Sequence, residues 1–433
     1  MKWFYRWAWL LGLIWLAGCQ PGGLALSNPL SPLASPEPTQ TQAAAATAAV
    51  SPAASPSATP NRPLTIWLPA RFSPYTGKSG ADLLKDRLAA YQAAHPQQQI
   101  EVRIKAETGP GGLLDSLSAA SAAAPDSLPD LIVLPRTDLE TAALKGLIYP
   151  LDTLSTASKD PDWYPYARQL MLVQGSTFGL PLAGDALALI YRPGQIPNVP
   201  TDWAGMGKLS VPVGFPAADP QALLTLAFYQ AAGGKIQDSQ QRPILQANAL
   251  ASVLSFYSDG LNHGTFPAGN ALSDSYDQVW QAYHDHKTNL VITWISHYLA
   301  ELPPDSSVMT LPAPQKTPQT IATGWLLAVA SPSVERRSSA AQLAEFLAQS
   351  DFLSRWTAAA GFLPPRPSAL SAWPDHSLAT LISQIELTAA SQPGIDLNGS
   401  LGPLLRDAAV QVIKGQGDPQ QIAQNTVQGL QAP

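Results

Sequence analysis

The chain of 433 residues is poor in cysteine and in charge. It has one cysteine, Cys19, so no disulfide can form within the chain and no zinc or iron–sulfur site can be built on several cysteine ligands. Charged residues make up 13% of the sequence, about half the usual quarter. The 25 basic and 31 acidic residues give a net charge of −6, which argues against nucleic-acid binding because contacts to phosphates require a basic surface.

Several catalytic motifs are also absent. The sequence has no Gly-Xaa-Ser-Xaa-Gly elbow, no phosphate-binding glycine loop with lysine and no His-Glu-Xaa-Xaa-His. Acidic residues are too sparse for a hydrolytic pair to be assigned by spacing. What the chain does have is length for two or three domains, 42 prolines and many alanines, serines and glutamines, a composition typical of a secreted or surface protein.

The first nineteen residues predict a leader. Lys2 and Arg6 precede an apolar run, residues 7–15, that is too short for a permanent transmembrane helix. The sequence LAGC follows at residues 16–19. This order of charge, apolar run and tetrapeptide resembles the lipobox of bacterial lipoproteins, which implies a signal peptide over residues 1–18 and a lipid, palmitate included, on Cys19. An ordinary signal peptide or anchor helix with an incidental cysteine is the alternative.

A segment of low complexity follows the leader. Residues 20–62 consist largely of Pro, Ala, Ser and Thr, and their only charged residues are Glu37 and Arg62. This composition cannot bury enough apolar surface to offset the entropy of the chain. We therefore expect residues 19–62 to be a lipid anchor and tether, with a root-mean-square reach of roughly 35–40 Å.

The remainder predicts an α/β fold. Strand patterns at 64–68, 100–105 and 129–134 alternate with helix patterns at 79–91 and 113–124, and a short helix is expected from Asp138 to Gly146. Ser79, with Asp82 three residues later, is typical of a capping box. Asp418 before Pro419 predicts the start of a last helix. Strands alternating with helices at these spacings predict a parallel sheet.

Ten short segments resemble one family when they are taken in order. They are PDLIV (129–133), LKGLIYPLD (144–152), FGLP (178–181) with ALALIYR (186–192), VPTDW (199–203), AAGG (231–234), LVITW (290–294), LPAP (311–314), TGW (323–325) and AGFLPPR (360–366). Each segment is weak alone. Together, over residues 64–430, they resemble the extracellular solute-binding proteins of ABC importers, specifically family 1, the group that includes maltose-binding protein.

The resemblance implies the two-lobed periplasmic-binding-protein-like fold of type II, in which hinge crossings join two α/β lobes around a ligand cleft. One lobe would comprise residues 64–183 plus 319–368, and the other 185–310 plus 369–433. The implied function is that of a lipid-anchored protein on the extracellular face of the cell membrane, which captures a sugar or oligosaccharide and delivers it to ABC permease subunits. The resemblance implies a monomer with no cofactor and no metal.

Nine residues are candidates for the ligand site. A sugar presents hydroxyls and an apolar ring face, so its site requires acidic or amide side chains and flat aromatic surfaces. Asp185 aligns with an acidic cleft position of the family, and Asp219 and Gln221 stand at a predicted helix start. Loops that follow predicted strands, where parallel sheets present ligand sites, supply the other polar candidates. The full set is Arg71, Tyr75, Arg136, Asp138, Asp185, Asp219, Gln221, Trp294 and Trp325.

Each candidate has a structural alternative. Asp185 could be a loop-end carboxylate facing water, Asp138 could cap the following helix, and Trp294 and Trp325 could simply pack in the core. The segment His284-Asp285-His286, with His263 and His297 nearby, suggests a metal, but histidines two apart diverge on a helix and we expect a solvated turn.

Two departures from the maltose-binding pattern bear on the ligand. Phe72 stands where that group has a basic residue and Thr137 where it has an acid, which puts a maltodextrin ligand in doubt. Two other functions stay open at this point. The first is a ligand-sensing lipoprotein with the same fold, and the second is a secreted carbohydrate-active enzyme.

Overall fold

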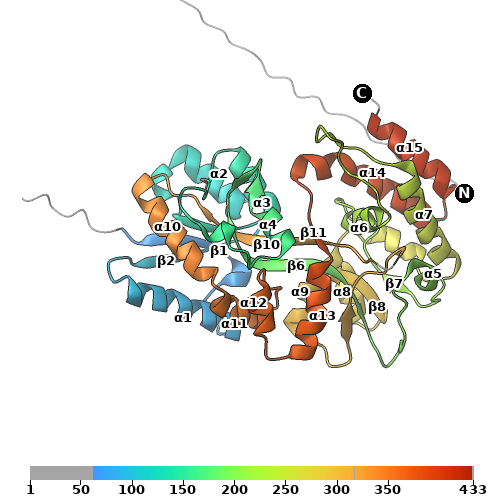
Figure 1. Cartoon of the computed structure of the whole chain (residues 1–433), viewed down its shortest axis with the longest axis horizontal. Helices are drawn as coiled ribbons and strands as arrows, with labels where there is room; N and C mark the ends of the chain where they lie inside the picture. Colours follow the sequence, from blue (N-terminus) through green and yellow to red (C-terminus); the bar gives the residue numbers. More distant parts are fainter. Residues whose placement is uncertain (1–61, 316, 432–433) are drawn as a thin grey trace, which may run out of the picture. The chain divides into compact units, whose positions relative to one another are not determined.

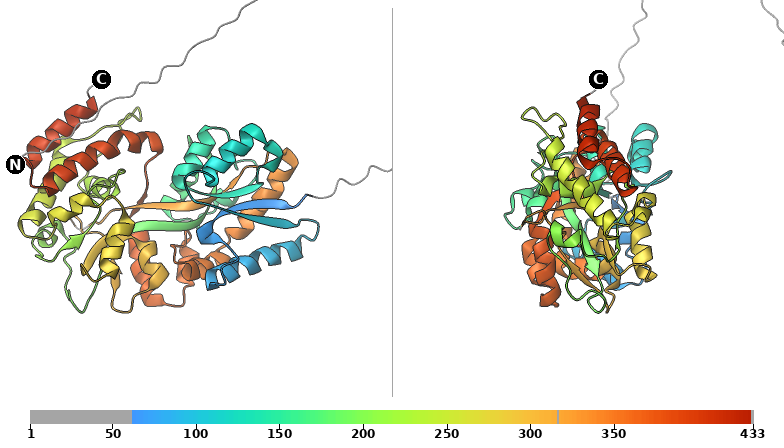
Figure 2. Two further views of the ribbon diagram at one scale, coloured as in Figure 1. Left: turned by 180° about the vertical axis from the view of Figure 1, so that it is seen from behind. Right: turned by 90° about the vertical axis from the view of Figure 1, so that its right-hand side faces the viewer.

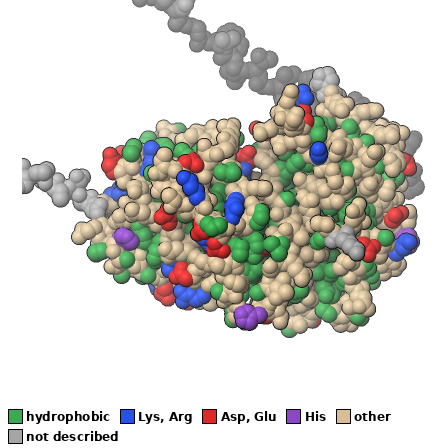
Figure 3. All heavy atoms as spheres, viewed as in Figure 1, with side chains coloured by type: hydrophobic (Ala, Val, Ile, Leu, Met, Phe, Trp, Pro, Cys, Tyr) green, Lys and Arg blue, Asp and Glu red, His purple; other side chains and the backbone are tan. Residues whose placement is uncertain are grey.

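The computed structural model describes residues 62–315 and 317–431. The predicted leader, Cys19 and nearly all of the predicted tether fall outside these residues. Within the described part of the chain, no helix combines the length and the apolar character that crossing a bilayer requires. Charged side chains are thinly scattered over the face seen in Figure 3, in keeping with the charge-poor composition.

The first three strands form a parallel sheet, as the sequence predicts. Strand β1 (Leu64–Pro69) pairs in parallel with β2 (Ile100–Lys105) on one side and with β3 (Leu131–Pro135) on the other. Helices α1 (Ser79–Ala94) and α2 (Leu113–Ala123) connect the strands. Strand β2 is partly covered on only one face. Strand β3 is buried on both faces, which explains why the sequence of β3 is a continuous apolar run.

Two long antiparallel strands continue this sheet through the middle of the molecule. The strand order is β2-β1-β3-β10-β6-β8-β7, with β11 paired to β10 and β9 paired to β6. Figures 1 and 2 show β6 and β10 running between two groups of helices. The remaining strands are β4 (Leu172–Val173), β5 (Ser176–Thr177), β6 (Leu180–Tyr191), β7 (Val213–Gly214), β8 (Leu290–Trp294), β9 (Ser307–Met309), β10 (Thr320–Val329) and β11 (Ala389–Ser391).

We call the group built around β1–β3 the first lobe. Its helices are α1, α2, α3 (Arg136–Leu144), α10 (Val334–Leu347) and α11 (Ser350–Ala360). Helix α4 (Pro165–Leu170) lies along β6 and β10, and α12 (Pro367–Ser371) connects α11 to α13 (His376–Leu387), which contacts β6. Short 3₁₀ helices occur at Ala70–Phe72, Pro125–Ser127, Ala157–Lys159 and Ala268–Leu272.

We call the group built around β7–β9 the second lobe. Its helices pack on these strands or on one another (Figure 1). They are α5 (Trp203–Met206), α6 (Leu223–Ala231), α7 (Ala247–Asn262), α8 (Tyr276–His284), α9 (Ile295–Glu301), α14 (Ile395–Ile413) and α15 (Pro419–Gln431). The predicted start of the last helix is confirmed, because the Asp418 carboxylate accepts a hydrogen bond from the Gln421 N–H at 3.0 Å.

The buried apolar residues form two clusters that share β6. Ala186, Ala188 and Ile190 belong to the first cluster and Leu187 and Leu189 to the second, because alternate side chains of a strand point to opposite faces. The first cluster also takes in residues of α13, which the predicted bounds assign to the other lobe. The lobe bounds drawn from the sequence stay a prediction.

Two local predictions were wrong. Helix α1 begins at Ser79 with Lys78 as its N-cap, and no side chain caps it, so Ser79 and Asp82 form no capping box. Helix α3 begins at Arg136 rather than Asp138, with Pro135 as its N-cap, so Asp138 is not a capping residue. The helix ends at Leu144, just before Gly146, whose φ of +67° suits a glycine.

Candidate functional site

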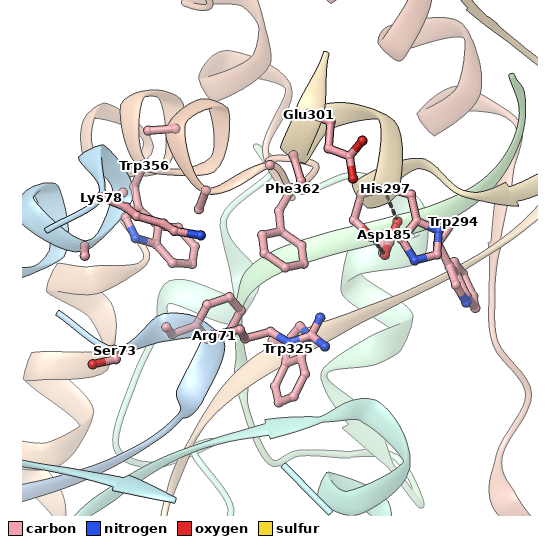
Figure 4. A pocket seen from close by; sticks show the side chains of 18 of the residues that line it. Arg71, Ser73, Lys78, Asp185, Trp294, His297, Glu301, Trp325, Trp356 and Phe362 are labelled. Carbon is pink, nitrogen blue, oxygen red and sulfur yellow. Dashed lines mark hydrogen bonds between the residues drawn. The ribbon is translucent and has the colours of Figure 1, made fainter. Parts of the chain in front are cut away.

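A cavity of about 780 Å³ lies beside the central strands and is lined by both lobes (Figure 4). The first lobe contributes the segment after β1 and the end of α11, and the second lobe contributes α8, α9 and the end of β8. Four of the nine predicted site residues line this cavity: Arg71, Asp185, Trp294 and Trp325. Its aromatic lining is Phe72, Trp280, Trp294, Trp325, Trp356 and Phe362.

Asp185 lies within β6 and not in a loop. The strand runs unbroken from Leu180 to Tyr191, and Asp185 stands opposite Thr323 of β10, which also lines the cavity. The structural alternative for Asp185, a loop-end carboxylate facing water, was therefore wrong. The strand continues because both of its halves have partners, β10 on one side and β8 on the other.

The Asp185 carboxylate is held in one orientation. It is 9% exposed and accepts hydrogen bonds from the Ser296 N–H (3.1 Å), the Ser296 hydroxyl (2.5 Å) and the Ala186 N–H (2.9 Å). Burial raises the pKa of Asp185 to about 6, although these hydrogen bonds and the charge of Arg71 act in the opposite direction. At neutral pH the cavity therefore presents a fixed carboxylate that can accept hydrogen bonds from a ligand.

Helices α8 and α9 form one wall of the cavity. His297 contacts the Asp277 carboxylate through Nε2 (2.8 Å) and the Thr293 hydroxyl through Nδ1 (2.7 Å), and its ring stacks on Trp280 at 5.6 Å. The Trp280 indole N–H donates to the Glu301 carboxylate at 3.2 Å. Burial lowers the pKa of His297 despite the neighbouring Asp277, so this imidazole is neutral at neutral pH.

The segment after β1 forms the opposite wall. Arg71 pairs with Glu107 at 2.6 Å and its guanidinium lies 5.2 Å from the Trp325 ring centroid. Phe72 meets Trp325, Trp356 and Phe362 edge-on, with ring centroids 5.2–5.3 Å apart. Phe72 and Trp356 are almost fully buried, so they support the wall more than they face the cavity.

The two predicted tryptophans line the cavity from different strands. Trp294 ends β8, and its ring tilts against Tyr276 at 5.5 Å. Trp325 lies within β10, opposite Pro135 and Ala183. Both indoles are partly exposed and offer apolar surface to the cavity.

Three predicted residues from the first lobe lie elsewhere. Tyr75 is 65% exposed and does not line the cavity. Arg136 is buried against Glu140 (2.8 Å) and the Leu172 carbonyl (3.2 Å), and it borders a separate cavity of about 780 Å³. Asp138 lines neither of these cavities, and burial raises its pKa.

The predicted pair in the second lobe is occupied by local contacts. Asp219 accepts hydrogen bonds from the N–H groups of Gln221 (3.0 Å) and Leu223 (3.0 Å) and from the Tyr276 hydroxyl (3.3 Å). The Gln221 side chain accepts a bond from Gln392 at 2.8 Å. Asp219 therefore orders the start of α6, and neither residue lines the cavity that holds Asp185.

The sequence did not predict Asp277, Trp280, His297 and Glu301 as site residues. A helical signal was available, because Asp277 and Trp280, like His297 and Glu301, stand three or four residues apart on helices that flank Trp294. No group of three or more His, Cys, Asp or Glu within residues 62–315 and 317–431 is arranged to hold a metal ion. His284 and His286 are exposed at the end of α8.

Comparisons with known proteins point to one kind of protein. Residues 86–379 match the model of a family described as bacterial extracellular solute-binding protein. A search of curated proteins finds no match.

Solved structures share the fold at low identity. The sugar-binding protein MalE from Xanthomonas citri is 20% identical (TM-score 0.70, 85% of this chain and 96% of that chain). The cyclic α-maltosyl-1,6-maltose binding protein from Arthrobacter globiformis is 16% identical (TM-score 0.69, 85% and 98%). UgpB from Mycobacterium tuberculosis, solved with glycerophosphocholine, is 16% identical (TM-score 0.67, 86% and 98%). The two-lobed periplasmic-binding-protein fold expected from the sequence is thereby confirmed.

Proposed function

Because this chain belongs to the bacterial extracellular solute-binding proteins, we propose that it captures a sugar or oligosaccharide in the cavity between its lobes and delivers it to the permease of an ABC importer. One observation carries the choice of ligand class. The cavity combines a fixed carboxylate, Asp185, with partly exposed indoles, Trp294 and Trp325, from different strands. A carboxylate accepts hydrogen bonds from hydroxyls, and a flat ring covers the C–H face of a sugar.

Known relatives support a hydroxylated ligand. MalE from Xanthomonas citri is described as a sugar-binding protein, the Arthrobacter globiformis protein binds a cyclic maltosyl-maltose, and UgpB was solved with glycerophosphocholine. These ligands differ in size and charge but all carry hydroxyl groups. The polar and aromatic lining of the cavity suits a member of this broad class.

The mechanism is binding without catalysis. A ligand that touches Arg71 or Lys78 on the first lobe and Ser296 or Glu301 on the second makes its full set of contacts only when the lobes come together. Such a ligand shifts the population towards a closed form by the free energy of those extra contacts. The permease would then recognise the closed form.

The membrane anchor belongs to the same proposal. The LAGC sequence before residue 20 supports lipidation of Cys19 after removal of residues 1–18. A lipid-anchored monomer on the extracellular face of the cell membrane would keep the binding site close to its permease. The tether of residues 19–62 would let the folded part reach that partner.

Titration calorimetry with a panel of mono- and oligosaccharides tests the ligand class. We expect one-to-one binding without turnover, and we expect Trp294→Ala and Trp325→Ala each to weaken it about tenfold, because each removes apolar contact with a ring face. Tyr75→Ala is the matched control, since its exposed ring lies outside the cavity lining. Unchanged affinity in both tryptophan variants would remove these residues from the site, and product formation would favour an enzyme instead.

A further inference from the structure

The α8–α9 wall and the adjacent strand β6 carry three carboxylates that form no ion pair with a lysine or arginine of the described residues. Asp185, Asp277 and Glu301 all line the cavity. Within the described part of the chain, no lysine or arginine nitrogen lies within 4.0 Å of any of the three carboxylates. Their nearest basic partners are histidines, His297 beside Asp277 and the exposed His284 at 3.8 Å from Glu301.

The opposite wall supplies little compensation. Arg71 is already paired with Glu107 at 2.6 Å. Lys78 lines the cavity and forms no ion pair with any described residue, so it is the one uncompensated cation of the lining. Figure 4 shows Lys78 and Arg71 on one side of the cavity and Glu301 and Asp185 on the other. The lining therefore sets three carboxylates against a single free ammonium group.

All three carboxylates are oriented by neighbouring groups. Ser296 holds Asp185, His297 holds Asp277 at 2.8 Å, and the Trp280 indole N–H holds Glu301 at 3.2 Å. The partly exposed indole of Trp294 stands beside them, because Trp294 directly precedes α9 and its ring meets Tyr276 at the start of α8. The face of an indole ring attracts a cation as well as a C–H surface. Oriented carboxylates next to aromatic rings form a site that recognises an ammonium group with several N–H donors.

We propose that the solute is a hydroxylated primary amine, an amino sugar or an aminocyclitol, whose protonated amino group faces Asp277 and Glu301. The inference rests on the proposed function, since it names the ligand class of the same cavity. The side chains of Asp277 and Glu301 are 89% and 44% exposed, so water solvates both carboxylates in this form of the protein. A neutral sugar that displaced this water as the lobes close would leave the carboxylates without counter-charge, which is unfavourable for buried charges. An amine on the same ring supplies that charge while its hydroxyls remain available for Asp185.

Titration calorimetry on the full-length chain with matched ligands tests the proposal. The panel pairs glucosamine, galactosamine and mannosamine each with the parent hexose and the N-acetyl derivative, and streptamine with scyllo-inositol. We expect at least one amine to bind about tenfold or more tightly than its hydroxyl and N-acetyl counterparts. The parent hexoses control for size, because a hydroxyl replaces the ammonium group, and the N-acetyl compounds control for the nitrogen, because they keep it without its charge.

Isosteric variants test whether the carboxylates of the α8–α9 wall cause the preference for amines. Asp277→Asn and Glu301→Gln retain the acceptors for His297 and Trp280 and remove the charge, so each is expected to reduce the preference for the amine about tenfold with little effect on the parent hydroxyl compound. Asp126→Asn is the control, because Asp126 is an exposed acid outside the cavity lining. Thermal unfolding of each variant verifies that it is folded.

Each result is decisive. An amine preference that survives both variants would overturn the assignment to this wall. Sugars that bind at least as well as their amines would overturn the amine proposal and leave the proposed function standing. Absence of binding both in this panel and in the panel of mono- and oligosaccharides that tests the proposed function would overturn both.

Discussion

At the scale of single residues, the cavity keeps a carboxylate where burial disfavours its charge. Asp185 has a pKa raised from 3.8 to about 6 by desolvation, and the surrounding hydrogen bonds only partly offset this effect. If Asp185 served stability alone, an uncharged side chain at this position would give a higher free energy of unfolding, because burying a charge is unfavourable. Functional sites are where such local conflicts are expected, because binding requires the group.

Asp185→Asn should separate stability from binding. A carboxyl whose pKa is raised in the folded state binds more protons there than in the unfolded state between about pH 4 and pH 6, so the free energy of unfolding decreases as pH rises through this window. The asparagine does not titrate, so the variant should lack this dependence on pH. Above pH 6 its free energy of unfolding should exceed that of the parent by on the order of 3 kcal/mol, because a change of one pKa unit corresponds to about 1.4 kcal/mol. Ligand affinity should fall.

Urea unfolding of both proteins from about pH 4 to pH 7, with calorimetry of ligand binding, measures these quantities. The parent protein should bind ligand less well as pH falls through about 6, because protonation removes acceptor capacity from Asp185. A variant with the parent's pH slope would show that the carboxyl titrates normally.

At the scale of elements, the predictions succeeded where a pattern is local and failed where it depends on distant partners. Strands β1, β2 and β3 follow from runs or alternations of apolar residues within each segment. The unbroken course of β6 does not, because Gly184-Asp185 suggests an interruption and only the pairing with β10 and β8 keeps the strand extended. The register of such pairs is set by tertiary packing.

The site residues divide in the same way, into those that a local pattern indicates and those that it does not. Trp294 and Asp185 could be found because they stand in or at the end of apolar strands, whereas Asp277 and Glu301 lie on helices with the polar surface typical of any exposed helix. Asp219 was predicted as a binding residue because it stands at a helix start, but its carboxylate accepts a hydrogen bond from the backbone of that helix instead. Acidic residues are common at helix starts for capping as well as for binding, so the position alone does not distinguish the two roles.

Gly184 in β6 is a position at which a single methyl group should destabilise the centre of the sheet. A Cβ there would lie 2.4 Å from the Tyr166 hydroxyl, which donates to the buried Glu386 carboxylate at 3.2 Å. Gly184→Ala must displace Tyr166 and disturb that bond. We expect the free energy of unfolding in urea to fall by about 1–3 kcal/mol.

Gly194→Ala is the matched control, because nothing lies within 4 Å of the Cβ that it would add and its φ is not positive. It should leave the free energy of unfolding almost unchanged. Equal stability of the Gly184 and Gly194 variants would mean that the Tyr166 hydroxyl moves aside without cost.

At the scale of the whole molecule, the cavity depends on segments that are far apart in the sequence. Lys78 and Glu301 line the same space from different lobes, and β6 and β10 carry Asp185 and Trp325 between them. Periodicity along one segment cannot reveal such a meeting. The resemblance of ten short motifs, taken in order, to one family indicated that these segments meet, because the members of a family share one fold.

Lipidation of Cys19 would determine where this two-lobed body operates, and it can be tested on the full chain. Cys19→Ala removes the thiol that a diacylglycerol donor would alkylate and leaves the rest of the leader intact. In bacterial cells supplied with a radiolabelled fatty acid, the parent protein should carry label and sediment with membranes, and the variant should carry none and appear in the soluble fraction. Gln20→Ala is the control, since it preserves the LAGC sequence. Equal labelling of the parent and the Cys19 variant would contradict lipidation at this residue. A variant that carries no label but still sediments with membranes would indicate that the apolar run anchors the chain by itself.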